Sequence, residues 1–302
     1  LFSFYSLMGN YTKSFDGTRV YYDYHVGTPP TLVFLHGVGG NWTVWKKEIK
    51  FFQNKGYSTL ALDLRGHGLS DAPKPFNKYQ MPHFSQDIYG ILNKEGITDF
   101  VLIGHSLGGA VAINYCMLHS KKLPTSLILV ESASVYPFDH ERMLNYGPYT
   151  THLLRYISKH GSLRRRHLSH LEDLDLSEHG IKFNLHLISY LLHLTPLCSM
   201  VKTLDNVEKY FFKNQNRIES CLHNLPIPLL VLAGGHDKIV PPKFAFRIKK
   251  LVKNAELKLF KKADHHITID HPQQVSHTIL SFLQNKLHVK KARKVLRKVK
   301  SF

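Results

Sequence analysis

Cysteine is scarce in this sequence. Only three cysteines occur among 302 residues, and Cys116, Cys198 and Cys221 are widely spaced. An odd, scattered set provides neither a disulfide framework nor the paired spacing of a zinc site. We therefore expect a reducing compartment and predict a cytoplasmic location.

Long hydrophobic runs are also missing. The sequence has no run of about 18 apolar residues, so a transmembrane helix is not expected. The apolar start, residues 1–7, is short and lacks a basic segment, which argues against a secretory signal peptide. The chain does not begin with Met, and Met8-Gly9 is a candidate natural start.

Acidic residues are few. The 22 Asp and Glu residues face 40 Lys and Arg residues, so the formal net charge is +18. Eight of the basic residues and no acidic residue lie between Lys286 and the end, which leaves +10 (18 − 8) for the rest. A basic surface attracts anionic partners over a distance without identifying one.

Short β-rich runs alternate with helix-compatible segments, which predicts an α/β fold with a mostly parallel central sheet flanked by helices. A hairpin is expected first, across the turn signal Asp16-Gly17. The expected strands are 11–15, 20–26, 31–35, 58–62, 100–103, 127–130, 229–233 and 257–260, and the expected helices are 42–54, 83–94, 108–119, 243–253 and 273–285.

The alternation stops between the strands at 127–130 and 229–233. Residues 135–224 are rich in Leu, His and Tyr and are predicted to form several helices, which we interpret as a helical cap insertion. The predicted domains are therefore a core of residues 1–134 and 225–285, the insertion 135–224, and a basic C-terminal tail 286–302.

A candidate nucleophile lies in Gly104-His105-Ser106-Leu107-Gly108-Gly109. This G-x-S-x-G pattern follows an apolar strand and precedes a helix-forming run, the context in which it predicts a nucleophilic serine on a tight strand-to-helix turn. Glycines on both sides allow that turn, and the helix N-terminus supports developing negative charge.

Further motifs extend this pattern along the chain, and together they resemble the α/β-hydrolase superfamily over residues 11–285. The motifs, in the order typical of the superfamily, are His36-Gly37-Val38-Gly39-Gly40, Asp63-Leu64-Arg65-Gly66-His67-Gly68-Leu69-Ser70-Asp71, the Ser106 motif, Gly235-His236-Asp237-Lys238-Ile239-Val240-Pro241 and Asp264-His265. In the second motif we expect Arg65 and Asp71 to tie loops together.

The resemblance implies a Ser–Asp–His triad in that order, and this chain offers Ser106, Asp237 and His265. A serine hydroxyl needs a base to take its proton and an acid to orient that base. Glu131, directly after the strand 127–130, is a rival acid or a supporting hydrogen-bonding group. His266 is the rival base. Asp264 stands where glycine is common in the family.

The resemblance also implies an oxyanion hole made by the backbone N–H groups of Val38 and Leu107. His36 is expected to brace the Val38 loop. The candidate substrate-pocket residues are Trp42, His105, Tyr136, Phe138, Met143 and Ile239; Trp45, Tyr146, Tyr149 and Met200 are further candidates, and core packing is the alternative for each.

The expected activity is hydrolysis of carboxylic esters through an acyl-enzyme, with no metal and no cofactor. A lactonase, thioesterase, amidase or C–C bond hydrolase would use the same triad, and a non-catalytic binding protein of this fold is a further alternative. A serine nucleophile argues against epoxide hydrolase activity, which the family resemblance associates with an aspartate. For the tail, a solvated terminus competes with an amphipathic helix that contacts an anionic surface.

Overall fold

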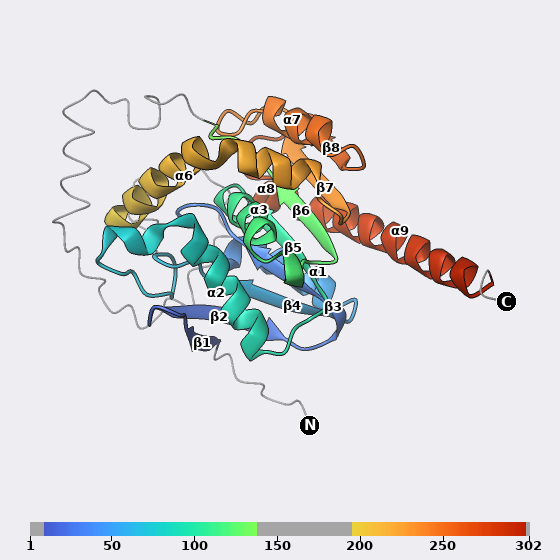
Figure 1. The fold of residues 1–302 in the computed structure, drawn as a ribbon, viewed down its shortest axis with the longest axis horizontal. Coiled ribbons are helices and arrows are strands. Elements are labelled where there is room, and N and C mark those ends of the chain that lie inside the picture. Colours follow the sequence, from blue (N-terminus) through green and yellow to red (C-terminus); the bar gives the residue numbers. More distant parts are fainter. Residues whose placement is uncertain (1–8, 138–194, 300–302) are drawn as a thin grey trace.

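The computed structural model describes residues 9–137 and 195–299 of the chain, with side chains described as far as Lys286. A single sheet of eight strands runs through it, in the order β1-β2-β4-β3-β5-β6-β7-β8 (Figure 1). The strands are β1 Asn10–Lys13, β2 Arg19–His25, β3 Thr28–Leu35, β4 Tyr57–Leu62, β5 Phe100–His105, β6 Ser126–Val130, β7 Leu229–Gly234 and β8 Glu256–Phe260.

The sheet is antiparallel only at one end. β1 pairs with β2, and β2 with β4, in antiparallel register, which confirms the predicted hairpin. Gly17 at its turn has φ 83°, a conformation that favours glycine. The pairs from β4 to β8 are all parallel, so the carboxyl ends of those strands lie along one edge.

Helices cover both faces of the sheet (Figure 1). Parallel strands buried on both sides require apolar residues throughout, which explains the continuous apolar runs of β5, β6 and β7. The helices are η1 Trp42–Trp45, α1 Lys46–Gln53, η2 Phe76–Tyr79, α2 Met81–Lys94, α3 Leu107–Leu118, η3 Ser120–Lys122, α6 Leu197–His223, α7 Lys243–Leu251, α8 Ile267–Asp270 and α9 Pro272–Val299.

Two hydrophobic cores lie on opposite faces of the sheet. Val33 and Leu35 of β3 belong to the core beneath α2, α3, α6 and α7, and the intervening Phe34 belongs to the core beneath α1, α8 and α9. This alternation follows from the two-residue period of a strand. Trp45, a candidate pocket residue, is fully buried in the second core.

The predicted cap insertion is described only in part, since 138–194 lie outside the described residues. Its C-terminal portion forms α6, whose Phe211, Ile218 and Leu222 are buried in the first core. These turns therefore pack as part of the helical layer on the sheet. Within the described ranges, no helix is both long and apolar enough to cross a membrane.

Candidate functional site

Five loops meet at the carboxyl edge of the parallel strands. They follow β3, β5, β6, β7 and β8 and carry His36, Ser106, Glu131, Asp237 and His265. Because these strands are parallel and adjacent, residues far apart in sequence come together at one edge, where sites in open α/β sheets gather.

Ser106 occupies the sharp turn between β5 and α3. Its φ of 52° and ψ of −115° lie outside the regions that a non-glycine residue ordinarily adopts. The Ser106 N–H donates to the Val130 carbonyl at 2.9 Å, which ties the turn to β6. Strain of this kind persists only where the surroundings hold it, and it is concentrated at functional sites.

Two glycines make room for this turn. A Cβ on Gly104 would lie 2.3 Å from the Gly108 carbonyl oxygen, and a Cβ on Gly108 would lie 2.4 Å from the Leu35 carbonyl oxygen. In both cases the neighbour is backbone that cannot swing aside. The glycine spacing around Ser106 is therefore a steric requirement of the close approach of α3, β5 and β3.

His265 connects Ser106 to Asp237. Its Nε2 lies 3.1 Å from Ser106 Oγ, and its Nδ1 lies 2.7 Å from Asp237 Oδ2. The second oxygen of Asp237 accepts from the Ile239 and Val240 N–H groups, both at 2.8 Å. The carboxylate is thus fixed by its own loop, and the imidazole has one nitrogen directed at the carboxylate and the other at the hydroxyl.

The rival residues have other contacts. His266 directly precedes α8, and its ring centroid lies 5.8 Å from that of His265. Burial lowers the pKa of His266. No described hydrogen bond joins Glu131 to the His265 ring; Glu131 Oε2 instead lies 3.1 Å from His105 Nε2 and accepts from the Ile267 N–H at 3.3 Å.

Glu131 is a buried carboxyl group beside the Asp237–His265 pair. It is 1% exposed, and its Oε1 has no hydrogen-bond partner among the described residues. Burial raises its pKa to about 9, with the nearby Asp237 charge adding to the shift and His265 opposing it. Glu131 is therefore a neutral acid at pH 7, which disfavours it as the carboxylate that would stabilise an imidazolium.

His105 supports the backbone of His265. Its Nε2 lies 3.2 Å from the His265 carbonyl oxygen, which can only accept, so this nitrogen carries the proton. Burial lowers the pKa of His105 to about 4, and the ring is neutral at pH 7. The sequence predicts His105 as a pocket residue, and it indicates this contact with His265 only by placing His105 next to Ser106.

His105, Glu131 and His265 are also close enough to be considered as metal ligands. Both ring nitrogens of His265 already face Asp237 and Ser106, and the His105 nitrogen in this cluster carries a proton. Metal binding would have to break these bonds, because a ligating nitrogen must be unprotonated. The donor set therefore fits a hydrogen-bonded network better than a metal centre.

The loop after β3 passes directly beside Ser106. A Cβ on Gly37 would lie 3.2 Å from Ser106 Cβ, and His36 braces the loop by donating from Nδ1 to the Gly37 carbonyl at 2.7 Å. His36 Nε2 accepts the Leu64 N–H, and burial lowers the pKa of this histidine well below its ordinary value. Val38, the predicted N–H donor, follows Gly37 in this loop.

The start of α6 reaches the same loop. A Cβ on Gly39 would lie 3.4 Å from Met200 Cε. Met200 therefore approaches the site from the end of the predicted insertion, which makes its flexible apolar side chain a stronger pocket candidate than the sequence indicated.

The remaining predicted pocket residues are dispersed. Trp42 is half-buried against the second core, and its backbone N–H donates to Asp63 Oδ1 at 2.7 Å. Tyr136 packs on Phe212 of α6, with ring centroids 5.8 Å apart. Ile239 is 44% exposed on the Asp237 loop. Phe138 and Met143 lie outside the described residues, as do Tyr146 and Tyr149.

The Asp63–Asp71 motif is a structural junction. Arg65 is fully buried and pairs with Asp87 of α2 at 2.6 Å and with Asp16 of the hairpin turn at 3.0 Å. Asp71 pairs with Arg19 of β2 at 3.3 Å, where both side chains are substantially exposed. These contacts tie β2, the hairpin and α2 together, as the sequence predicted.

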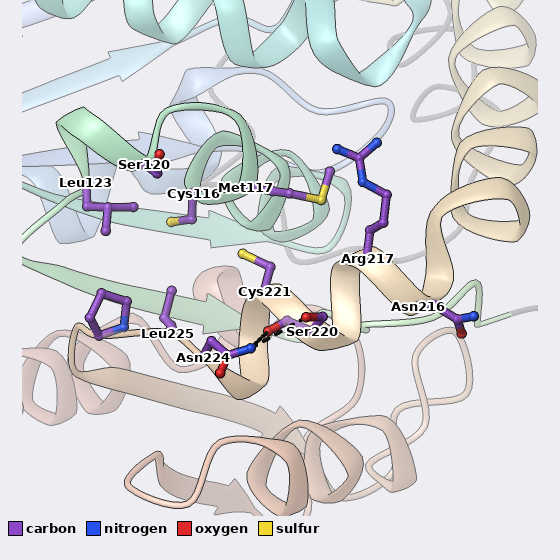
Figure 2. Close-up of a pocket in the computed structure, with 11 residues that line it drawn as sticks. Cys116, Met117, Ser120, Leu123, Asn216, Arg217, Ser220, Cys221, Asn224 and Leu225 are labelled. Atoms are coloured by element: carbon purple, nitrogen blue, oxygen red, sulfur yellow. Dashed lines mark hydrogen bonds between the residues drawn. The ribbon is translucent and has the colours of Figure 1, made fainter.

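A separate cavity of about 640 Å³ lies between the far end of α3 and α6 (Figure 2). Cys116 and Cys221 lie on these facing helices, and Leu123, Leu225 and Pro226 contribute to its walls. The cavity is roughly 16 Å along α3 from the Ser106 turn, taking about 1.5 Å per residue from Leu107 to Leu118. It is therefore distinct from the edge that carries Ser106.

Comparison with known proteins adds a family context. The family model described as the alpha/beta hydrolase fold matches residues 30–152. Epoxide hydrolase 3 of Xenopus tropicalis is 26% identical over 84% of this chain and 71% of its own length. The match to Protein ABHD8 of Mus musculus is also 26% identical and covers 83% of this chain, but only about half (54%) of that protein. Among solved structures, an esterase from Exiguobacterium antarcticum has a TM-score of 0.72 at 20% identity, covering 92% of this chain and 100% of its own.

Proposed function

Because this chain belongs to the α/β-hydrolase superfamily, we propose that it is a serine hydrolase that cleaves carboxylic esters. One observation carries the proposal: Ser106 Oγ, the two ring nitrogens of His265 and Asp237 Oδ2 form an unbroken hydrogen-bonded series at 3.1 and 2.7 Å. Such a series activates a serine hydroxyl that is otherwise a weak nucleophile at neutral pH.

In the proposed reaction, Ser106 Oγ attacks the ester carbonyl carbon as His265 Nε2 takes the hydroxyl proton. The Val38 and Leu107 N–H groups donate to the oxyanion that forms. His265 then returns the proton to the departing alcohol, which leaves an acyl group on Ser106. Water attacks this acyl-enzyme with His265 again as base, and the carboxylic acid is released.

Asp237 holds the imidazole with its proton on Nδ1 and stabilises the imidazolium in both steps. His105 lies outside the triad and is proposed as a positioning residue that holds the His265 backbone. The three free cysteines support a reducing, cytoplasmic location for this activity.

The nucleophile separates this proposal from the activity named in the epoxide hydrolase relative. Ser106 carries a hydroxyl where the family resemblance associates epoxide opening with an aspartate. We therefore expect hydrolysis of p-nitrophenyl esters and no turnover of aryl epoxides.

The test compares Ser106→Ala with Ser120→Ala, an exposed serine beyond the other end of α3. Loss of a triad serine lowers kcat by about 10⁶-fold. We expect Ser106→Ala to lose turnover of short p-nitrophenyl esters to that extent and Ser120→Ala to retain it. Full activity in a folded Ser106→Ala protein would refute the mechanism. A panel of acyl-chain lengths, lactones and thioesters then identifies the preferred bond.

A further inference from the structure

The C-terminal helix α9 is a single helix from Pro272 to Val299, which crosses the predicted boundary at residue 286. Its first half is anchored by Val275, Ile279, Phe282 and Leu283, which are buried against the second core. Its later turns extend away from the sheet toward the C-terminus (Figure 1). From Lys286 to Val299 the helix rises roughly 20 Å, at about 1.5 Å per residue.

This projecting segment has an unusual composition. Every residue from 289 to 299 is either apolar or basic, and none is acidic. Basic residues four apart, such as Lys290 and Lys294 or Arg293 and Arg297, repel one another on a helix. The segment contains no carboxylate to offset this repulsion, and an external anion would relieve it.

The two kinds of residue fall on separate arcs of the helix. At about 100° per residue, the apolar positions cover an arc of about 120° and the basic positions a separate arc of about 160°. The apolar positions are Val289, Ala292, Val295, Leu296 and Val299, and the basic positions are Lys290, Lys291, Arg293, Lys294, Arg297 and Lys298.

The apolar arc is not a continuation of the face that packs on the core. The buried positions between Val275 and Leu283 centre roughly 130° around the helix from the apolar arc of 289–299, by the same geometry. The terminal segment is therefore a second amphipathic unit with its own orientation, joined to the first by continuous helical backbone.

We propose that residues 289–299 of α9 dock on an anionic lipid bilayer, with the helix lying in the interface. A bilayer offers an apolar layer and an anionic layer side by side, and a basic amphipathic helix fits both. A nucleic acid would satisfy the basic arc and leave the apolar arc without a partner. The apolar side chains are small to medium aliphatics, so binding depends strongly on lipid charge and on salt.

The experiment uses the full chain and cosedimentation with vesicles of phosphatidylcholine alone or mixed with phosphatidylserine. We expect binding only to the mixed vesicles and release at high salt. The triple variant Lys290→Glu, Lys294→Glu and Arg297→Glu should lose binding by more than about tenfold, because each basic residue near an anionic surface contributes to attraction.

Two comparisons make the test specific. A control with the same charge change at exposed Lys13, Lys253 and Lys258, each replaced by Glu, should bind more tightly than the tail variant by at least about tenfold. The double variant Leu296→Asp and Val299→Asp keeps the basic arc, and it should also lose vesicle binding.

Equal binding by the two triple variants would overturn the proposal, as would binding by the double variant that matches the unaltered chain. In the second case the segment would be a general polyanion site, and duplex DNA would compete with the vesicles. The inference is independent of the proposed ester hydrolysis: turnover of a soluble short-chain ester should be the same in all three variants and in the unaltered chain.

Discussion

Replacing Asp237 by Asn tests the identity of the acid more sharply than truncating the side chain. Asp237 Oδ1 accepts two N–H groups at 2.8 Å, so the amide oxygen of an asparagine is held in that place. The amide NH₂ then occupies the position of Oδ2, 2.7 Å from His265 Nδ1. It donates to Nδ1, which forces the imidazole proton onto Nε2, and His265 can no longer accept the Ser106 proton.

The expected cost follows from that wrong tautomer. The equivalent change in a serine-protease triad lowers kcat by about 10⁴-fold, with geometry intact. This corresponds to about 5.4 kcal/mol of barrier, at about 1.36 kcal/mol per factor of ten. We therefore expect Asp237→Asn to lose about 10⁴-fold in kcat on a short p-nitrophenyl ester at pH 7 and to unfold at the same urea concentration as the unaltered protein.

Glu131→Gln is the matched variant, because Glu131 is the rival acid and glutamine is close in shape to its protonated form. Burial keeps the Glu131 carboxyl neutral at pH 7 by raising its pKa to about 9. Replacement by an uncharged amide should change kcat by less than about tenfold, well short of a lost triad carboxylate. The reverse ranking, with Glu131→Gln inactive and Asp237→Asn active, would refute the assignment of Asp237.

Three further predictions concern stability and, for Gly108, ester turnover. The folded-state pKa of Glu131, about 9, exceeds its ordinary value of 4.5, so its contribution to stability is full below pH 4.5 and is lost as pH rises through 9. Between these values the free energy of unfolding should fall by up to about 1.4 kcal/mol per pH unit, and Glu131→Gln should remove this fall in urea unfolding. The same pH dependence in the variant and the unaltered protein would contradict the prediction. Arg65→Met should lower the free energy of unfolding by about 3–5 kcal/mol, because the buried Asp87 carboxylate loses its cation and Asp16 keeps only the pair with Lys78. Arg19→Met, at an exposed pair, should cost less than about 1 kcal/mol. Equal costs would be inconsistent with the buried junction. Gly108→Ala should abolish ester turnover, measured as kcat, since its Cβ would meet backbone at 2.4 Å. Gly90→Ala within α2 has open space and should stabilise the protein by about 0.5–1 kcal/mol in urea unfolding. An active, stable Gly108→Ala protein would show that the turn can shift.

Local patterns in the sequence were sufficient for most of the framework. The structure confirms every predicted strand, from the hairpin to β8, because buried parallel strands require continuous apolar runs and the turns between them carry glycine and aspartate. The predicted helices shift by only a few residues, apart from α9, which continues beyond residue 285. Helix ends are weakly encoded, since a run of basic residues is compatible with either a helix or a solvated tail.

Local patterns in the sequence also predict some residues of the candidate site and not others. Ser106 could be predicted because its turn demands a local glycine pattern, and the choice between Asp237 and Glu131, or His265 and His266, could be narrowed by family resemblance alone. The residues that support the site were harder to predict: nothing near His105 in sequence indicates that its ring meets the carbonyl of His265, 160 positions away.

The sequence by itself determined the alternation of strands and helices, the strained turn at Ser106, and the separation of apolar from basic positions around the terminal helix. Each of these depends on residues within a few positions of one another. Only the tertiary structure decided which carboxyl group meets His265, that Glu131 is buried and neutral, and that Met200 approaches the Val38 loop. These outcomes depend on the order and register of strands in the sheet, which bring distant loops to one edge and set how much water each side chain retains.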